Sequence, residues 1–315
     1  MQARRQWITT HEWMVQPTAQ TEWIEGQGIL IWMAEVFSAL GMGLYLVSLF
    51  LNNWWGMLAG WFIIVLLKLP FHFFYLGRPW RFWRAIPPFT NAWKTSWIAR
   101  GMFFTSVFAG LAMIQLITTY LLDHNMVAES LVPGVLLLDW AMRILAGFFA
   151  LLTGIYCGFV MSYCKAIPFW NTGLLPIVFV IMGLADGLAL IMGVGLITGG
   201  VDFHAIEVAS QWALIINAIL ITTYLINASY QSATAEYSVM QLIMGKAAKA
   251  FWIGVILLGI AVPLTISLLS IFVLEFSPVL MILAVISHTI GAFALKYCVL
   301  KVGIYRPIIS RVPVY

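Results

Sequence analysis

The sequence has few charged side chains. Only 9% of its 315 residues are Asp, Glu, Lys or Arg, whereas 63% are apolar, and the mean hydropathy is +0.97. A soluble domain carries roughly 25% charged and about 45–50% apolar residues. The protein therefore has too few polar side chains to cover a globule in water. This composition excludes a soluble enzyme, a nucleic-acid-binding domain and a disordered protein, and it leaves a polytopic membrane protein.

The sequence is also poor in the patterns that bind metals. Its three cysteines lack metal-ligand spacing, so we expect no iron–sulfur cluster in this chain. No CxxCH motif is present, which excludes covalent haem. A b-type haem needs paired axial ligands, and only His72 and His288 fall in apolar segments, at different depths. We therefore expect neither haem nor a bound metal. The N-terminus has no apolar h-region and is not a secretory signal peptide.

Eight apolar runs are long enough to cross a bilayer, which takes roughly 20 residues. The runs are continuous rather than alternating, which disfavours a transmembrane barrel. The predicted fold is therefore all-α, with eight transmembrane helices. We place the spans at 28–51, 55–76, 101–121, 133–161, 173–197, 208–229, 251–274 and 277–300.

Basic residues outside the membrane lie on one side of these spans. Eight spans put both termini on the same side, here called side A, and the opposite side is side B. Side A carries thirteen Lys and Arg residues, and side B carries none. By the positive-inside rule, side A is predicted to be the cytoplasm. Side A also has the longest loop, 77–100, so we expect this face to meet a cytoplasmic partner.

Polar side chains inside a bilayer are costly, and each needs a reason. Glu35 and Lys68 lie roughly 10–12 Å below side A, at about 1.5 Å per residue, on helices joined by a very short turn. We expect them to pair. His72 and Tyr156 lie near the same depth. One interpretation is a neutralised structural pair. The other is a pocket for a lipid-soluble quinone, which needs hydrogen-bond donors and proton carriers.

Four further residues lie deeper in the membrane. Asp139 and Arg143 are spaced i, i+4, which favours a local ion pair. Asp186 lies near mid-membrane between two glycines, and His288 lies at comparable depth. These four residues are a possible proton path from side B towards the pocket. Lys296, near the side A end of its helix, is expected to extend to the interface.

Arginines and tryptophans alternate in the longest loop. Residues 78–84 (RPWRFWR) place an arginine every three residues around two tryptophans. This composition is typical of an interfacial anchor. The alternative is a docking site for an acidic partner subunit above the pocket, with Arg100 at the end of the same loop. That site would comprise Arg78, Arg81, Arg84 and Arg100.

Several motifs in the first five spans resemble the NrfD/PsrC family, the membrane subunits of respiratory molybdopterin iron–sulfur oxidoreductases. The match lies mainly within residues 28–190, and the remainder resembles the family in hydropathy and span count. The motifs are 39–45 (ALGMGLY), 76–83 (LGRPWRFW), 95–101 (TSWIARG), 156–158 (YCG), 168–171 (PFWN) and 174–179 (LLPIVF).

The resemblance implies a haem-free, quinone-reactive membrane anchor built from two four-helix bundles. The bundles would span 28–161, with the quinone site, and 173–300, flanked by an N-terminal segment 1–27 and a tail 301–315. Tyr156 matches a tyrosine that binds quinone in this family, and Glu35 falls within about a residue of a polar position lining that site. The quinone would be menaquinone or ubiquinone.

The resemblance also implies partners. They are a ferredoxin-like four-cluster iron–sulfur subunit and a large molybdopterin catalytic subunit, so no activity is expected from this protein alone. The location would be the inner membrane of a prokaryote. Many family members carry their catalytic subunits outside the cytoplasm, whereas the charge count here places the docking face inside. Without the 77–100 loop the count is still eight basic residues against none.

A secondary transporter is the competing interpretation. Transporters break helices near the midplane, in both halves of the sequence. Asp186, the glycine-rich stretch 183–200 and Pro263 within a helix are compatible with such a break. The sequence predicts no matching break in the first half.

Overall fold

A computed structural model describes residues 17–272 and 277–308. It confirms an all-α protein with eight helices that are long and apolar enough to span a membrane. Four spans lie within one residue of the predicted ranges: α2 (Gly28–Phe50), α7 (Val132–Ser162), α8 (Leu174–Thr198) and α12 (Pro278–Lys301). Two spans start earlier than predicted, α9 (Phe203–Gln231) by five residues and α6 (Trp97–Asp123) by four. The Ser96 side chain accepts from the Ala99 N–H and caps α6 at its early start. Arg4, Arg5, Glu275 and Arg311 of the charge count lie outside the described residues.

The second and seventh spans are composite helices. The second consists of α3 (Trp54–Phe62), the π-helical η1 (Ile63–Lys68) and α4 (Leu69–Tyr75). The seventh consists of the π-helical η4 (Ala250–Ala261) and α11 (Val262–Phe272). π-helical segments are rare and occur frequently at functional sites. Here one carries Lys68, and the other carries Gly259, whose carbonyl contacts His288.

Side A carries additional short elements. The 77–100 loop contains the 3₁₀-helix η2 (Pro79–Ala85) and the helix α5 (Asn91–Thr95). The helix α10 (Ala233–Ile243), which follows α9, was not predicted from the sequence. Strand β1 (Thr18–Ala19) pairs antiparallel with β2 (Ile304–Tyr305), so the two ends of the described structure meet on this side. On side B, the 3₁₀-helix η3 (Glu129–Leu131) precedes α7.

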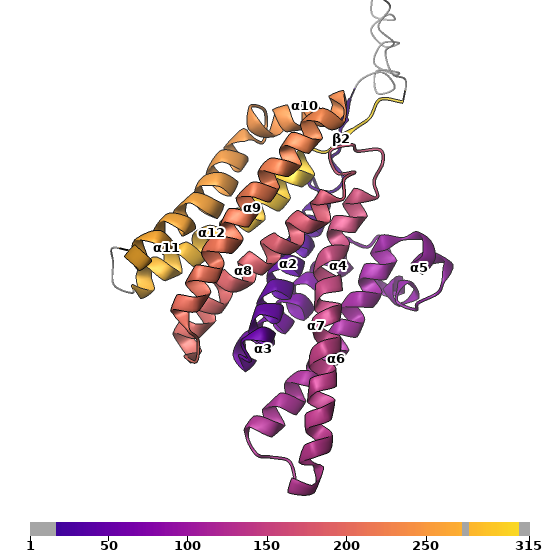
Figure 1. Cartoon of the computed structure of the whole chain (residues 1–315). Coiled ribbons are helices and arrows are strands. Elements are labelled where there is room, and N and C mark those ends of the chain that lie inside the picture. Colours follow the sequence, from indigo (N-terminus) through magenta and orange to yellow (C-terminus); the bar gives the residue numbers. More distant parts are fainter. Residues whose placement is uncertain (1–16, 273–276, 309–315) are drawn as a thin grey trace, which may run out of the picture.

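Helices α2 and α8 form the centre of the molecule. Figure 1 shows α9, α11 and α12 on one side of this pair and α6 and α7 on the other. The pair approaches closely at glycines: a Cβ on Gly43 would overlap the Gly183 carbonyl, and one on Gly187 would overlap the backbone of Gly43. Close backbone approach is the usual packing device of membrane helices, which gain little from hydrophobic exclusion.

The motif at 168–171 connects the two halves of the protein at side A. Trp170 is fully buried and its Nε1 donates to the Val299 carbonyl at 2.8 Å. The Tyr224 hydroxyl donates to the Phe169 carbonyl at 2.7 Å, and the Asn171 amide donates to the Ser162 carbonyl. These bonds tie the segment between α7 and α8 to α9 and α12. Its residues are structural in this protein.

Candidate functional site

A pocket near side A contains three of the residues expected to bind quinone. Glu35 comes from α2, His72 from α4 and Tyr156 from α7, and all three line the same cavity. Helical geometry places each of them roughly 5–10 Å from the side A end of its helix, at about 1.5 Å per residue. The other lining residues are Trp23, Ile31, Tyr75, Ile98, Cys157 and Val160. The pocket therefore combines a few polar groups with an apolar wall.

Two polar atoms in this pocket lack hydrogen-bond partners among the described residues. They are Oε2 of Glu35 and Nδ1 of His72, and both side chains are only 5% exposed. Buried polar atoms are nearly always hydrogen-bonded to protein or to ordered water. Their arrangement therefore fits a molecule that offers both a donor and an acceptor at this position.

Tyr156 is held in place by a glycine and a lysine. A Cβ on Gly101 would overlap the Tyr156 ring, which explains the glycine that ends the 95–101 motif. On another side, the Lys68 Nζ lies 5.0 Å from the ring centroid, within cation–π range. Lys68 itself is fully buried and donates to Thr105 Oγ1 at 2.5 Å. Lys68 thus supports the tyrosine and does not line the pocket.

The expected Glu35–Lys68 ion pair is absent from the described residues. The cation whose Coulomb field acts on Glu35 is Lys296 of α12. Lys296 is 2% exposed, and its Nζ lies 3.2 Å from the ring centroid of Phe179. The prediction that Lys296 extends to the interface is therefore wrong. Its helix packs against α2 and α8, which enclose the side chain, and no local sequence pattern reveals that contact.

A second polar cluster lies at mid-membrane. The His288 Nε2 is 2.9 Å from Asp186 Oδ1, and the His288 Nδ1 is 2.9 Å from the Gly259 carbonyl. In an α-helix, that carbonyl would accept from the N–H of residue 263, but Pro263 has none. The proline thus helps to free the acceptor that orients the histidine. Asn217, whose two amide atoms lack hydrogen-bond partners among the described residues, lines a small cavity with His288.

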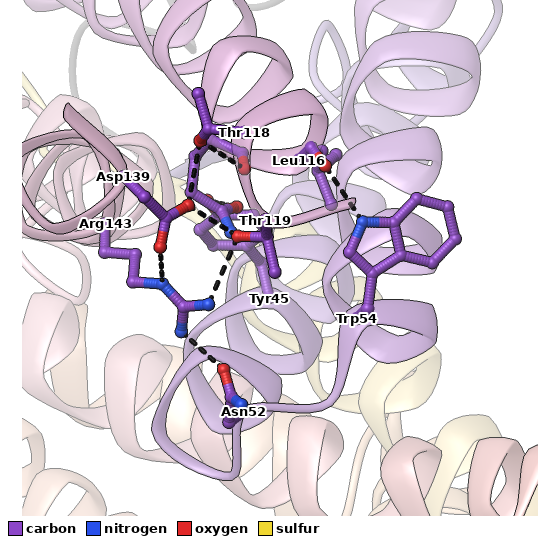
Figure 2. A network of polar contacts seen from close by, with 9 residues as sticks. Tyr45, Asn52, Trp54, Leu116, Thr118, Thr119, Asp139 and Arg143 are labelled. Atoms are coloured by element: carbon purple, nitrogen blue, oxygen red, sulfur yellow. Dashed lines mark hydrogen bonds and ion pairs between the residues drawn. The ribbon is translucent and has the colours of Figure 1, made fainter. Parts of the chain in front are cut away.

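Asp139 and Arg143 form the expected i, i+4 ion pair, at 2.6 Å. The pair belongs to a network near side B that also includes Tyr45 (Figure 2). The Tyr45 hydroxyl donates to Gln115, whose amide donates to Thr119. Thr118 and Thr119 donate to Asp139, and Arg143 donates to Asn52 and Thr119. Asp186 and His288 belong to the cluster at mid-membrane and not to this network. The structure therefore places the four predicted path residues in two separate groups.

The arginines of the 77–100 loop divide into two kinds. Arg78, Arg81 and Arg84 are exposed, beside Trp80 at 82% and Trp83 at 57% exposure. Arg100 instead donates to the Trp93 and Lys94 carbonyls and packs over the rings of Trp93 and Trp97. Arg100 therefore holds the loop together, and three arginines remain available to a partner.

No group of three or more His, Cys, Asp or Glu side chains in residues 17–272 and 277–308 could hold a metal ion.

Comparison with known proteins gives one family. The family model described as "Polysulphide reductase, NrfD" matches residues 33–307, which extends the resemblance into the second half of the sequence. The protein is 23% identical to the Protein NrfD homolog of Haemophilus influenzae over 253 residues, 76% of its own length and 78% of the relative. It is 27% identical to the C subunit of polysulfide reductase from Wolinella succinogenes over 168 residues, 51% and 53%. It is 25% identical to Protein NrfD of Escherichia coli over 262 residues, 76% and 78%.

Proposed function

Because this protein belongs to the NrfD family of membrane subunits of polysulfide-reductase-type complexes, we propose that it exchanges electrons between membrane quinone and an iron–sulfur partner subunit. The observation that carries this proposal is the pocket at Glu35, His72 and Tyr156, where two buried polar atoms have no hydrogen-bond partner in the part of the protein that the structure describes. A quinone would supply the two-electron redox chemistry there. The protein would supply hydrogen bonds, proton carriers and a position close to the partner.

Each pocket residue has a distinct proposed role. The Tyr156 hydroxyl donates a hydrogen bond to a quinone oxygen, and Glu35 and His72 exchange protons at the pocket wall. Lys68 positions the Tyr156 ring through the cation–π contact. The cavity volume is about 40 Å³, which suits a water better than a quinone ring. Quinone binding therefore requires lining side chains to move.

The partner would dock on side A above the pocket. Arg78, Arg81 and Arg84 are exposed in the loop that follows α4, and Trp80 adds a large apolar surface beside them. Arginine and tryptophan are the residues that most often dominate binding energy in protein interfaces. An acidic iron–sulfur subunit complements this surface in charge.

Charge reversal on this surface tests the proposed function. The complex purified through a tag on this protein should contain an iron–sulfur protein and react with a water-soluble quinol analogue. Arg81→Glu combined with Arg84→Glu should weaken retention of the iron–sulfur protein at least about tenfold, or 1.4 kcal/mol. The matched control, Lys246→Glu with Lys249→Glu, makes the same charge change on side A in the other half of the protein. Equal retention in both variants, or a purified protein without any iron–sulfur subunit, contradicts the proposal.

We further propose that side A faces the cytoplasm. A green fluorescent protein fused after Tyr315 should fluoresce, because it folds there, whereas alkaline phosphatase at the same position should be inactive. This expectation follows from the positive-inside rule, because side A carries thirteen basic residues and side B carries none. An active phosphatase fusion would reverse the orientation and move the partner to the outer face.

One structural feature is compatible with the alternative function as a transporter. Both halves of the protein contain a π-helical segment, η1 and η4, where the sequence predicts a break in only one half. Family membership nevertheless favours the oxidoreductase subunit. Substrate uptake by proteoliposomes that contain this protein without partner subunits would support the transporter instead.

A further inference from the structure

We propose that a pocket on side B, between α2 and the hairpin of α6 and α7, binds a zwitterionic phospholipid with a primary amine, phosphatidylethanolamine. Arg143 binds the phosphate of this lipid, and Asp123 binds its amine. The apolar wall of the pocket contacts the beginning of its acyl chains. The site lies at the opposite face from the quinone pocket, and the inference does not depend on the proposed quinone chemistry.

The pocket lies at the side B ends of α2, α6 and α7. Its volume is about 750 Å³, within the range of roughly 300–1,000 Å³ that is usual for small-molecule sites. Figure 1 shows that the α6–α7 hairpin reaches further on this side than α2 and α3. Phe50 and Ile144, which line the pocket, are exposed to the surrounding lipid. The polar lining residues are Asn52, Thr119, Asp123, Asp139 and Arg143, and the others are leucine, isoleucine, phenylalanine and tryptophan.

Tryptophans place this pocket at the level of the lipid headgroups. Trp140 lines the pocket with an exposed ring, and Trp55 is exposed at the start of α3. The Nε1 of Trp54 donates to the Leu116 carbonyl of α6 at 3.0 Å, less than one turn from Thr119. Tryptophan is enriched where a membrane meets water. The pocket therefore faces the headgroups and the adjacent part of the acyl chains.

Arg143 retains hydrogen-bond donors for a ligand. A guanidinium carries five N–H groups, and three of those on Arg143 donate to the protein (Figure 2). They donate to Asp139 Oδ2 and Asn52 Oδ1, each at 2.6 Å, and to Thr119 Oγ1 at 3.1 Å. One N–H on each terminal nitrogen has no acceptor among the described residues. Two such donors on one guanidinium match the oxygens of a phosphate.

The neighbours of Arg143 hold it in position for this contact. Asp139 accepts from Thr118 at 2.8 Å and from Thr119 at 2.6 Å in addition to Arg143. Its oxygens are therefore occupied within the protein, and it orients the guanidinium. Because Asn52 and Thr119 fix the same group from α6 and from the turn between α2 and α3, little side-chain freedom remains to be lost when a ligand binds.

Asp123 provides a second charge at the rim of the pocket. It lies four residues after Thr119 on α6, on the same face of the helix and about 6 Å closer to side B. Asp123 is exposed and lines the pocket. A ligand with its anionic group on Arg143 therefore meets a carboxylate about one helical turn nearer to the water.

The charges of the pocket favour a zwitterionic headgroup. Two carboxylates and one guanidinium line it, and no lysine or arginine falls in the side B loops. This excess of negative charge disfavours an anionic lipid, whereas a cation alone would leave the two Arg143 donors without an acceptor. Phosphatidylethanolamine has an ammonium towards the water, a phosphate below it and acyl chains towards the bilayer centre. The lining follows that order, because Leu46 and Leu49 precede Asn52 on α2 and lie deeper.

Lipid competition on the purified complex tests the proposal. The complex is delipidated in detergent and mixed with equal amounts of phosphatidylethanolamine and phosphatidylglycerol that carry the same acyl chains. Native mass spectrometry then measures which lipid is present in the species with one lipid bound. We expect phosphatidylethanolamine to exceed phosphatidylglycerol about fivefold, as one solvent-accessible charge pair gives. An equal ratio, or a preference for phosphatidylglycerol, overturns the proposal.

Charge reversal at the rim identifies the pocket as the site. Asp123→Lys should invert the ratio in favour of phosphatidylglycerol, because the new ammonium repels the amine of the other lipid. Glu129→Lys is the matched control, since it makes the same change at an exposed side B carboxylate that does not line the pocket. It should keep the wild-type ratio. Equal shifts in the two variants mean that surface charge in general selects the lipid, and they overturn the pocket as the site.

Removal of the guanidinium tests the phosphate contact. Arg143→Gln should lower binding of both lipids at least about tenfold, because hydrogen bonds to charged groups contribute about 1.5–3 kcal/mol each. Undiminished binding to a folded Arg143→Gln protein overturns the phosphate site. If this variant does not fold, the inverted ratio in Asp123→Lys decides, because Asp123 is exposed and its replacement leaves the buried network intact.

Discussion

Turnover with a quinol analogue is expected to fall about 10²- to 10³-fold when Glu35 is replaced by glutamine. General acid–base groups contribute typically 10²–10⁴-fold, and among the described residues that line the pocket Glu35 is the only carboxylate. Glutamine keeps the size and the hydrogen-bonding capacity of the side chain but carries no exchangeable proton of useful acidity. The loss should therefore appear in kcat, with the quinone dissociation constant changed little.

The control for this substitution is Glu25→Gln. Glu25 also lies near side A, in a half-exposed ion pair with Lys301 at 2.6 Å. Exposed ion pairs contribute about 0–1 kcal/mol to stability, and Glu25 does not line the pocket, so turnover should stay within about twofold of the wild type. Steady-state kinetics of the purified complex, with quinone affinity measured separately, decide the matter. If Glu35→Gln retains the wild-type kcat, Glu35 takes no part in the proton transfer.

Tyr156→Phe, assayed in the same way, separates quinone binding from proton transfer. This change removes one hydroxyl and keeps the ring that Gly101 and Lys68 contact. The fold should be preserved, and the lost hydrogen bond should weaken quinone binding by about 0.5–1.5 kcal/mol. A rise in KM with little change in kcat therefore distinguishes this role from that of Glu35.

The sequence predicted the elements well because the bilayer restricts the alternatives. In a bilayer every backbone group must be bonded within a helix or a closed barrel, so continuous apolar runs specify helices. The runs at 28–51 and 277–300 became α2 and α12 with nearly the same bounds. The helix α10 was missed because it lies on side A, where mean hydropathy carries no such signal.

The pocket was predicted in part, for a related reason. Depth follows from position along a helix, and depth alone placed Glu35, His72 and Tyr156 together. Rotation about the helix axis and the choice of neighbours do not follow from depth. Lys68 thus turned towards Thr105 and the Tyr156 ring, and Lys296 of a distant helix became the cation near Glu35. A contact between α2 and α12 is a property of tertiary packing.

The π-helical segments were also beyond sequence pattern. Residues 63–68 and 250–261 are apolar runs with no glycine or proline that marks a change in helix type at their start. Pro263 alone indicated an irregular helix, because it predicts a local break. It did not indicate that His288 would bind the Gly259 carbonyl. The position of His288 became informative once α12 was placed against η4.

Replacing Gly43 by valine should prevent assembly of the folded protein. Its Cβ would overlap the Gly183 carbonyl and would also approach Gly187, so neither backbone can move aside without separating α2 from α8. Overpacking costs typically about 1–3 kcal/mol where side chains can yield, and here the obstacle is main chain on both sides. We therefore expect a cost at or above the upper end of this range, seen as loss of the monodisperse peak in detergent size exclusion. Gly110→Val is the matched control, because α6 has open space there. A stable, monodisperse Gly43→Val protein would contradict the close crossing of α2 and α8 at the centre of the molecule.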